Sequence, residues 1–191
     1  MSRRIILAAL TVAFAAGLTA PTFAQDNDAS QQSAEELQKL FEKQKTRGLV
    51  IAPAGGAGAN AAAPAPEQLQ QAAVYSETDA DTEINVRISF DFDSALLRED
   101  QKPKLATLCE AMTNMEGQIF RIVGHTDAKG SEKYNQNLSV LRASEVKRYM
   151  VGTCGISEDR LIAIGVGEGH PVNDSDPNAE ENRRVEFQLI S

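Results

Sequence analysis

Residues 119–143 read IFRIVGHTDAKGSEKYNQNLSVLRA and contain, in order, a strand, a polar turn and a helix. Ile119 to Val123 is a compact run rich in β-branched residues, which is typical of a buried strand. After the turn, apolar residues recur at helical spacing and predict an amphipathic helix: Leu138, Leu141, Val146 and Tyr149. A strand joined to a helix in this way is the repeating unit of an α/β fold.

The sequence on either side of this unit continues the alternation of strands and helices. Upstream, residues 84–90 alternate apolar and polar side chains, and the spacing of Leu105, Leu108 and Met112 predicts a helix over residues 98–115. Downstream, residues 161–166 and 185–189 are predicted to be two further strands. We therefore predict an α/β domain over residues 82–191, a two-layer sandwich in β-α-β-α-β-β order, with the helices on one face of a four-stranded mixed sheet.

Residues 1–24 have the layout of a secretory signal peptide. Arg3 and Arg4 precede an apolar run from Ile5 to Leu18, and a small-residue site follows just before Gln25. The run has about 14 residues, whereas crossing a bilayer takes around 20. No cysteine follows the run, so we expect an exported protein without a lipid anchor.

The charge and the cysteines fit an exported binding protein. Without Arg3 and Arg4, the basic residues fall from 19 to 17 against 27 acidic ones, a net charge of −10. Nucleic acid is then not an expected partner, because neutralising phosphates takes clustered Lys and Arg. In an oxidising compartment Cys109 and Cys154 are expected to form a disulfide that stabilises the fold by about 2–4 kcal/mol. Two buried free thiols are the alternative.

Residues 25–80 are predicted to be mostly flexible, because Gln, Ala, Asp, Pro and Gly dominate them. A short amphipathic helix is expected at residues 33–45, where Leu37, Leu40 and Phe41 have helical spacing and Ser33 and Glu36 form a capping box. Residues 33–52 are candidates for binding an outer-membrane or other envelope protein, or for docking on the main domain. A mobile tail is the alternative.

The polar turn and the following helix carry the residues best suited to ligand binding. Asp127 lies where the predicted strand gives way to a loop, and Arg142 projects from the helix. A carboxylate can accept an ammonium group while a planar guanidinium clamps a carboxylate, so the pair suits a zwitterionic ligand. The alternative is that Asp127 caps the loop and Arg142 makes a surface ion pair worth about 0–1 kcal/mol.

Other kinds of site have weaker support in the sequence. Asp91 and Asp93 could share a strand face as in a glycosidase, but such a pair at a strand end is more often solvated. His125 and His170 have no partner at metal-ligand spacing. Three glycines at 165, 167 and 169 follow a strand, yet Pro171 blocks the helix that a phosphate loop needs. We expect no enzymatic activity, cofactor or metal.

Several short motifs occur in a recognisable order across residues 82–191. They are Phe92-Asp93-Ser94, Gly124-His125-Thr126-Asp127, Tyr134-Asn135, Leu138-Ser139 with Arg142-Ala143, and Glu181-Asn182-Arg183-Arg184-Val185. In this the chain resembles the OmpA-like peptidoglycan-binding domain, which is found in outer-membrane porin tails, Pal lipoproteins and flagellar motor proteins.

The resemblance implies non-covalent binding of peptidoglycan, through the diaminopimelate end of its stem peptide. That end carries both an ammonium and a carboxylate, which agrees with the charge argument. By position, the implied ligand-binding residues are Asp127 and Arg142 as the main pair, with Asn135, Asp93, Thr126 and either Arg183 or Arg184 as further contacts. The implied location is the periplasm or cell envelope of a Gram-negative bacterium, where the protein would tether or organise the envelope.

Overall fold

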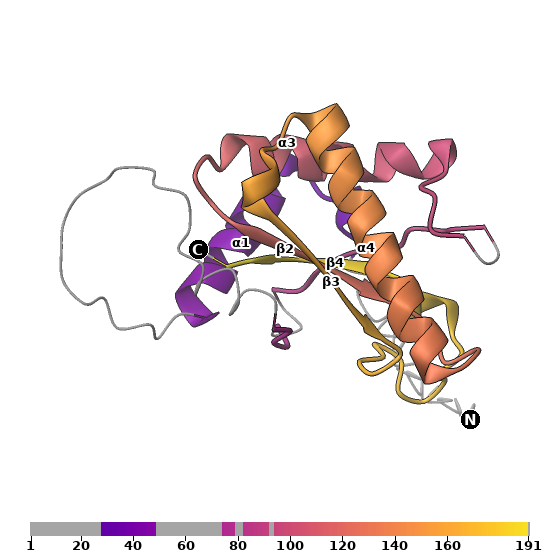
Figure 1. The fold of residues 1–191 in the computed structure, drawn as a ribbon. Coiled ribbons are helices and arrows are strands. Elements are labelled where there is room, and N and C mark those ends of the chain that lie inside the picture. Colours follow the sequence, from indigo (N-terminus) through magenta and orange to yellow (C-terminus); the bar gives the residue numbers. More distant parts are fainter. Residues whose placement is uncertain (1–27, 49–73, 79–81, 92–93, 191) are drawn as a thin grey trace, which may run out of the picture.

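The computed structural model describes residues 28–48, 74–78, 82–91 and 94–190 (Figure 1). The predicted signal peptide, residues 49–52 and Asp93 lie outside these ranges. The strands are β1 (Ile84–Val86), β2 (Phe120–His125), β3 (Leu161–Gly167) and β4 (Val185–Leu189). The α-helices are α1 (Ala34–Gly48), α3 (Ala106–Asn114) and α4 (Glu132–Cys154), and short 3-10 helices include η2 (Glu99–Leu105) and η4 (Glu180–Asn182).

The four strands form one mixed sheet in the order β1-β4-β2-β3. Strand β4 is antiparallel to both of its neighbours, whereas β2 and β3 are parallel and are connected by α4. The predicted fold class is therefore confirmed. Because the parallel pair runs in one direction, the segments that follow β2 and β3 begin at the same edge of the sheet.

All three α-helices pack on one face of the sheet (Figure 1). Phe120, Ile122 and Phe187 point from the strands into this layer and are fully buried. Phe41 of α1 meets Phe120 edge-on, with 5.0 Å between the ring centroids. The core therefore lies between the sheet and the helices, as expected for a two-layer sandwich.

Two glycines let α4 lie unusually close to the parallel strands. A Cβ atom on Gly124 would stand 2.2 Å from the Ser139 carbonyl oxygen, and one on Gly165 would stand 2.3 Å from the Ser139 hydroxyl. No side chain fits in that space, so the strands need glycine at both positions. The contact fixes the depth at which α4 sits over the ends of β2 and β3.

Helix α1 belongs to the same core as the domain. The capping box is present: Ser33 N donates to Glu36 Oε2 at 2.9 Å, and Glu36 N donates to Ser33 Oγ at 3.3 Å. Leu37 and Phe41 are fully buried, and the buried Gln44 side chain donates to the Thr82 carbonyl at 2.7 Å. The apolar face of the helix is thus occupied within the chain, and only its polar face remains on the surface.

Two predicted elements differ in extent from the observed ones. The first strand ends at Val86, because Val86 pairs with Val185 and β4 begins there, which leaves residues 87–90 without a partner strand. The helix predicted over residues 98–115 is a 3-10 helix as far as Leu105 and becomes α-helical from Ala106. Pro103 lies in the 3-10 part and cannot donate the backbone hydrogen bond that an α-helix interior needs.

The predicted disulfide between Cys109 and Cys154 is present. It joins α3 to the last residue of α4, with 5.4 Å between the Cα atoms. Gly155 then ends α4 in the left-handed conformation, with φ at 70°. None of the described helices combines the length and apolar character needed to cross a bilayer.

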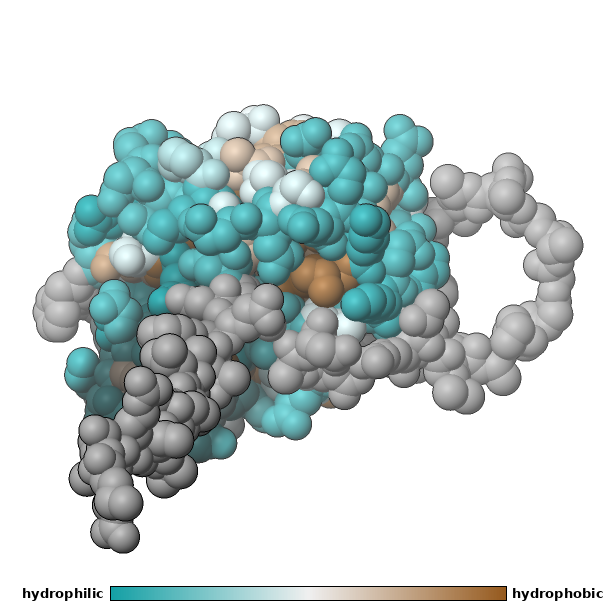
Figure 2. Space-filling view, turned by 180° about the vertical axis from the view of Figure 1, so that it is seen from behind, coloured by the Kyte–Doolittle hydropathy of each residue, from teal (hydrophilic) through white to brown (hydrophobic). Residues whose placement is uncertain are grey.

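The other face of the sheet carries a buried polar layer beneath residues 74–78. Glu186 accepts hydrogen bonds from Thr78 Oγ1 at 2.6 Å and from Tyr75 OH at 3.3 Å, and it lies 3.1 Å from His125 Nε2. Gln188 Nε2 donates to the Ser76 carbonyl at 2.8 Å. Figure 2 shows the molecule turned by 180° about the vertical axis, where the described surface is mainly hydrophilic with a smaller apolar patch.

Candidate functional site

The candidate site lies at the edge of the sheet where β2 and β3 end. Thr126 and Asp127 follow β2, and both are buried. Thr126 N donates to the Gly167 carbonyl at 2.9 Å, which ties the end of β2 to the end of β3. Helix α4 begins nearby and presents Asn135, which is 1% exposed and donates to the Asp127 carbonyl at 3.2 Å.

Asp127 caps its loop and also forms an ion pair. Its Oδ1 accepts from Lys129 N at 3.3 Å, as the capping alternative predicted. Its Oδ2 accepts from Arg183 Nη1 at 2.7 Å, and Lys129 Nζ lies 3.8 Å from the same oxygen. Arg183 also lies 3.2 Å from Glu180. The carboxylate is therefore already neutralised by cations of its own chain.

Arg142 is a buried cation without a carboxylate partner among the described residues. Arg142 is 8% exposed, and its Nε donates to the Ser94 carbonyl at 3.4 Å. The guanidinium carbon lies 4.6 Å from the centroid of the Phe90 ring, a cation–π contact. Burial lowers the pKa of Arg142, although an arginine stays charged at neutral pH. The alternative of an ordinary surface ion pair does not describe this side chain.

A pocket of about 510 Å³ opens beside Arg142. Its walls come from the segment after β1, from η2, from α4 and from the segment that enters β4. Cations are numerous among the lining residues: Arg87, Lys104, Arg142 and Arg183. Asp28, Glu180 and Glu181 contribute negative charge. The pocket thus combines a buried guanidinium with surface charges of both signs, which suits a polar, charged ligand.

Arg183 and Arg184 point to different parts of the molecule. Arg183 faces Asp127 and lines the pocket. Arg184 is 5% exposed and contacts Asn85 and Glu83 on the other face of the sheet, at 3.2 and 3.3 Å. Of the two candidate cations, only Arg183 is near the other candidate residues.

One further residue, Glu168, lies at this junction and was not predicted from the sequence. Glu168 directly follows β3, and its Oε2 accepts a short hydrogen bond from Asn135 Nδ2. Thr126 Oγ1 is also notable, because it is buried and has no hydrogen-bond partner in the described part of the chain. The parallel pairing of β2 and β3 was the signal that could have led to Glu168, since it brings the ends of the two strands together.

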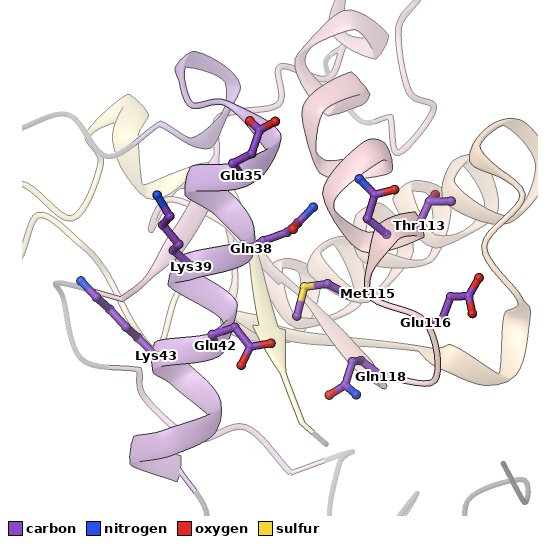
Figure 3. A pocket seen from close by; sticks show the side chains of 10 residues that line it. Glu35, Gln38, Lys39, Glu42, Lys43, Thr113, Met115, Glu116 and Gln118 are labelled. Atoms are coloured by element: carbon purple, nitrogen blue, oxygen red, sulfur yellow. The ribbon is translucent and has the colours of Figure 1, made fainter. Parts of the chain in front are cut away.

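Other regions carry weaker candidates. A larger groove of about 1210 Å³ runs between α1 and α3, and Figure 3 shows charged side chains of α1 along it, including Glu35, Lys39 and Glu42. Asp91, one of the two carboxylates considered for catalysis, pairs with Arg98 at 3.2 Å with 70% of its side chain exposed. Within the described residues, no three His, Cys, Asp or Glu side chains are grouped to hold a metal ion.

Residues 89–184, half of the chain, match the OmpA family. The chain belongs to this family. The match spans β2, α4, β3 and the segment that enters β4, so it includes Asp127, Asn135, Arg142 and Arg183. OmpA-like domains are structural modules without enzymatic activity, and membership therefore confirms the expectation of a non-enzymatic domain.

Two curated relatives are outer-membrane proteins by name. Outer membrane porin F of Pseudomonas aeruginosa is 35% identical over 101 residues, which are 51% of this chain and 29% of the porin. Outer membrane protein A of Bordetella avium is 32% identical over 101 residues, 52% of each chain. The chain therefore spans about half or less of the length of these relatives.

A solved structure extends the similarity beyond the family match. A putative MotB-like protein from Desulfovibrio vulgaris is 28% identical with a TM-score of 0.50. The alignment covers 84% of this chain and 90% of that protein.

Proposed function

We propose that this chain binds peptidoglycan non-covalently through the diaminopimelate end of the stem peptide and so helps to tether or organise the cell envelope. The observation that carries the proposal is the buried Arg142. Among the described residues Arg142 has no carboxylate partner. A buried charge in that state costs several kcal/mol, and a ligand carboxylate would supply the partner. A planar guanidinium binds a carboxylate with two parallel hydrogen bonds. Family membership supplies the class of ligand.

The remaining groups suit the other features of this ligand end. Asp127, which precedes Arg142 in the family's motif order, would receive the ammonium group. Asn135 holds the Asp127 backbone in place and Thr126 adds polar groups next to it. Arg183, rather than Arg184, would be the additional cation, because Arg184 is engaged on the other face of the sheet. Asp93 stays a proposed contact on the strength of its motif alone.

The signal-peptide pattern at residues 1–24 supports a place in the periplasm or cell envelope, and the absence of a cysteine after it supports a protein that is not lipidated. The names of the outer-membrane relatives agree with this location. One small ligand end makes few contacts, so each site should bind modestly. Retention on the wall would come from many copies binding a polymer.

A pelleting assay with insoluble peptidoglycan tests the proposal. We expect the purified protein to sediment with the wall and free diaminopimelate to release it, whereas Asp127→Asn and Arg142→Ala should bind at least about tenfold more weakly. Arg148→Ala is the matched control, because Arg148 lies on the same helix but is exposed and paired with Glu145 at 2.6 Å. Equal pelleting by all variants that remain folded would refute the site.

A protein partner bound through residues 33–52 is a second candidate. The groove between α1 and α3 favours it, because the polar face of α1 is on the surface there (Figure 3). Deleting this region would damage the core, since Leu37 and Phe41 are buried. The charge reversal Lys39→Glu is a cleaner test: it should reduce cross-linking to an envelope protein and leave peptidoglycan pelleting unchanged. Unchanged cross-linking would count against this partner surface.

A further inference from the structure

The proposed ammonium site has an electrostatic problem if Asp127 acts alone. Asp127 already accepts a hydrogen bond from Arg183 at 2.7 Å, and Lys129 lies 3.8 Å away. An incoming ammonium group would therefore compete for this carboxylate with Lys129 and with Arg183, which is itself shared with Glu180 at 3.2 Å. Like charges at this spacing repel, so the cations already paired with Asp127 weaken its attraction for a further cation. A second carboxylate without such partners would strengthen that attraction.

Glu168 is in the right place to be that carboxylate. It follows β3 directly, as Asp127 follows β2 after one residue, and the two strands are parallel. The amide of Asn135 bridges them, because its Nδ2 donates both to the Asp127 carbonyl and to Glu168 Oε2. Asn135 is 1% exposed, so this bridge is held rigidly between the strand ends and α4.

The carboxylate of Glu168 also has no cationic partner among the described residues. Within the described part of the chain, no Lys, Arg or His nitrogen lies within 4.0 Å of its carboxylate, and its hydrogen bond comes from a neutral amide. Asp127 and Glu168 thus differ sharply, since one is paired and the other is not. At the same junction Thr126 Oγ1 is buried without a partner, and its backbone N–H bonds to Gly167, the residue before Glu168.

We infer that Glu168 is the second carboxylate of the ammonium site, an inference that rests on the function proposed above. An ammonium group donates three hydrogen bonds. At the junction, Asp127 and Glu168 offer carboxylate acceptors for them, whereas Thr126 Oγ1, although it has no partner among the described residues, is buried. Glu168 supplies the negative charge that Arg183 takes from Asp127, and Arg142 binds the carboxylate of the same ligand end.

Three stem tripeptides that differ only at the third residue separate these roles. One ends in meso-diaminopimelate. The second has 2-aminopimelate, whose free end keeps the carboxylate and lacks the ammonium. The third has lysine, whose free end keeps the ammonium and lacks the carboxylate. Each is titrated calorimetrically into the full chain, its Glu168→Gln variant and its Arg142→Ala variant. Glutamine at 168 can still accept the bond from Asn135, so the change removes the charge alone.

We expect Glu168→Gln to weaken the diaminopimelate and lysine peptides by about fivefold, as for loss of one charge-assisted hydrogen bond in a partly exposed site. Binding of the 2-aminopimelate peptide should be unchanged. Arg142→Ala should show the complementary pattern and weaken the two peptides that carry the free carboxylate. Glu158→Gln is the control, because it removes an exposed carboxylate at the far end of α4, where Glu158 lies 3.5 Å from Lys147.

Two results would overturn the inference. If Glu168→Gln binds all three peptides like the wild type, Glu168 does not contact the ammonium. If it weakens all three equally, Glu168 has a structural role only. Failure of the proposed function looks different, because the wild type itself would then bind the diaminopimelate peptide no better than the 2-aminopimelate and lysine peptides, and the inference would fall with it.

Discussion

Arg142 at the pocket and Arg184 on the other face of the sheet are buried to a similar degree, 8% and 5% exposed. Their surroundings are opposite. Arg184 contacts Asn85, Glu83 and the His170 carbonyl, so its charge and its donors are satisfied by the chain. Arg142 has one backbone acceptor and an aromatic ring, and no carboxylate among the described residues. A buried charge that its own fold satisfies stabilises structure, whereas one left unpaired is available to a ligand.

The largest expected effect is on stability at the satisfied arginine. Arg184→Ala leaves Glu83 and Asn85 without their partner in a largely buried place and should lower the free energy of unfolding by about 3 kcal/mol. Urea unfolding followed by circular dichroism measures this. At a denaturant concentration where the variant is folded, peptidoglycan pelleting should match the wild type. A binding defect in the folded variant would contradict the assignment of a structural role to Arg184 and a ligand-binding role to Arg142.

The opposite sign is expected at Arg142, which has no carboxylate partner in the described part of the chain. Arg142→Met replaces a buried cation by an apolar side chain of similar length, so the free energy of unfolding should rise by about 1–2 kcal/mol while peptidoglycan binding is lost. The same urea titration gives the stability, and pelleting gives the binding. A loss of stability as large as that of Arg184→Ala would mean that Arg142 is structural.

The polar layer that adjoins Arg184 can be tested at a single hydroxyl. Thr78→Val removes the donor that reaches Glu186 Oε1 at 2.6 Å and keeps the shape of the side chain. Because the buried carboxylate loses a hydrogen bond, the free energy of unfolding should fall by about 1 kcal/mol. Thr113→Val is a suitable control, since Thr113 is exposed and its hydroxyl donates to the carbonyl of Cys109 in its own helix.

The smallest effect is a pH dependence from His125. Burial lowers its pKa, with Arg184 and His170 acting in the same direction and the hydrogen bond to Glu186 opposing them. The unfolded chain therefore takes up a proton below the ordinary pKa of about 6.5 that the folded chain does not. The contribution of His125 to stability is full above this pKa, so the free energy of unfolding should change little between pH 7.5 and 6.5 and should decrease as the pH falls from 6.5 to 5.5.

A variant of His125 tests whether this histidine causes the dependence of stability on pH. In His125→Gln, the free energy of unfolding should depend less on pH over that range, whereas His170→Gln should reduce the dependence only slightly, because His170 is the smallest of the causes that lower the pKa of His125. If the dependence on pH disappears only in His170→Gln, it does not come from His125. The range stops at pH 5.5 because Glu186, whose pKa is lowered by its bonds to His125, Thr78 and Gln188 despite burial, adds its own loss at more acidic pH.

Much of the fold followed from periodicity, and the exceptions have physical causes. The alternation at residues 84–90 correctly indicated a buried face, but a strand extends only as far as its partner, and β4 begins opposite Val86. The capping box and the spacing of Leu37 and Phe41 correctly indicated a helix. That this helix completes the core depends on contacts with Phe120 and Thr82, which are far away in the sequence.

The charged residues of the candidate site could be predicted from the sequence, but which of them contact one another could not. Asp127 and Arg142 were found from their residue types and motif. The choice between Arg183 and Arg184 follows from strand alternation: Val185 faces the helices, so Arg184, the residue before it, faces the other side. Glu168 could not be recognised from local pattern, because only the parallel pairing of β2 and β3 brings it to Asn135.

The disulfide also has a mechanical consequence. The candidate site lies toward the N-terminal end of α4, and Cys154 at the other end of that helix is bonded to Cys109 in α3. Force applied at the site would act first on the N-terminal part of α4, and the covalent bond at Cys154 would keep the other end joined to α3 even if the helix separated from the sheet. If the domain binds a polymer under tension, as the proposed function implies, the disulfide would limit how far the domain unfolds. Its removal should show as a lower rupture force in single-molecule pulling.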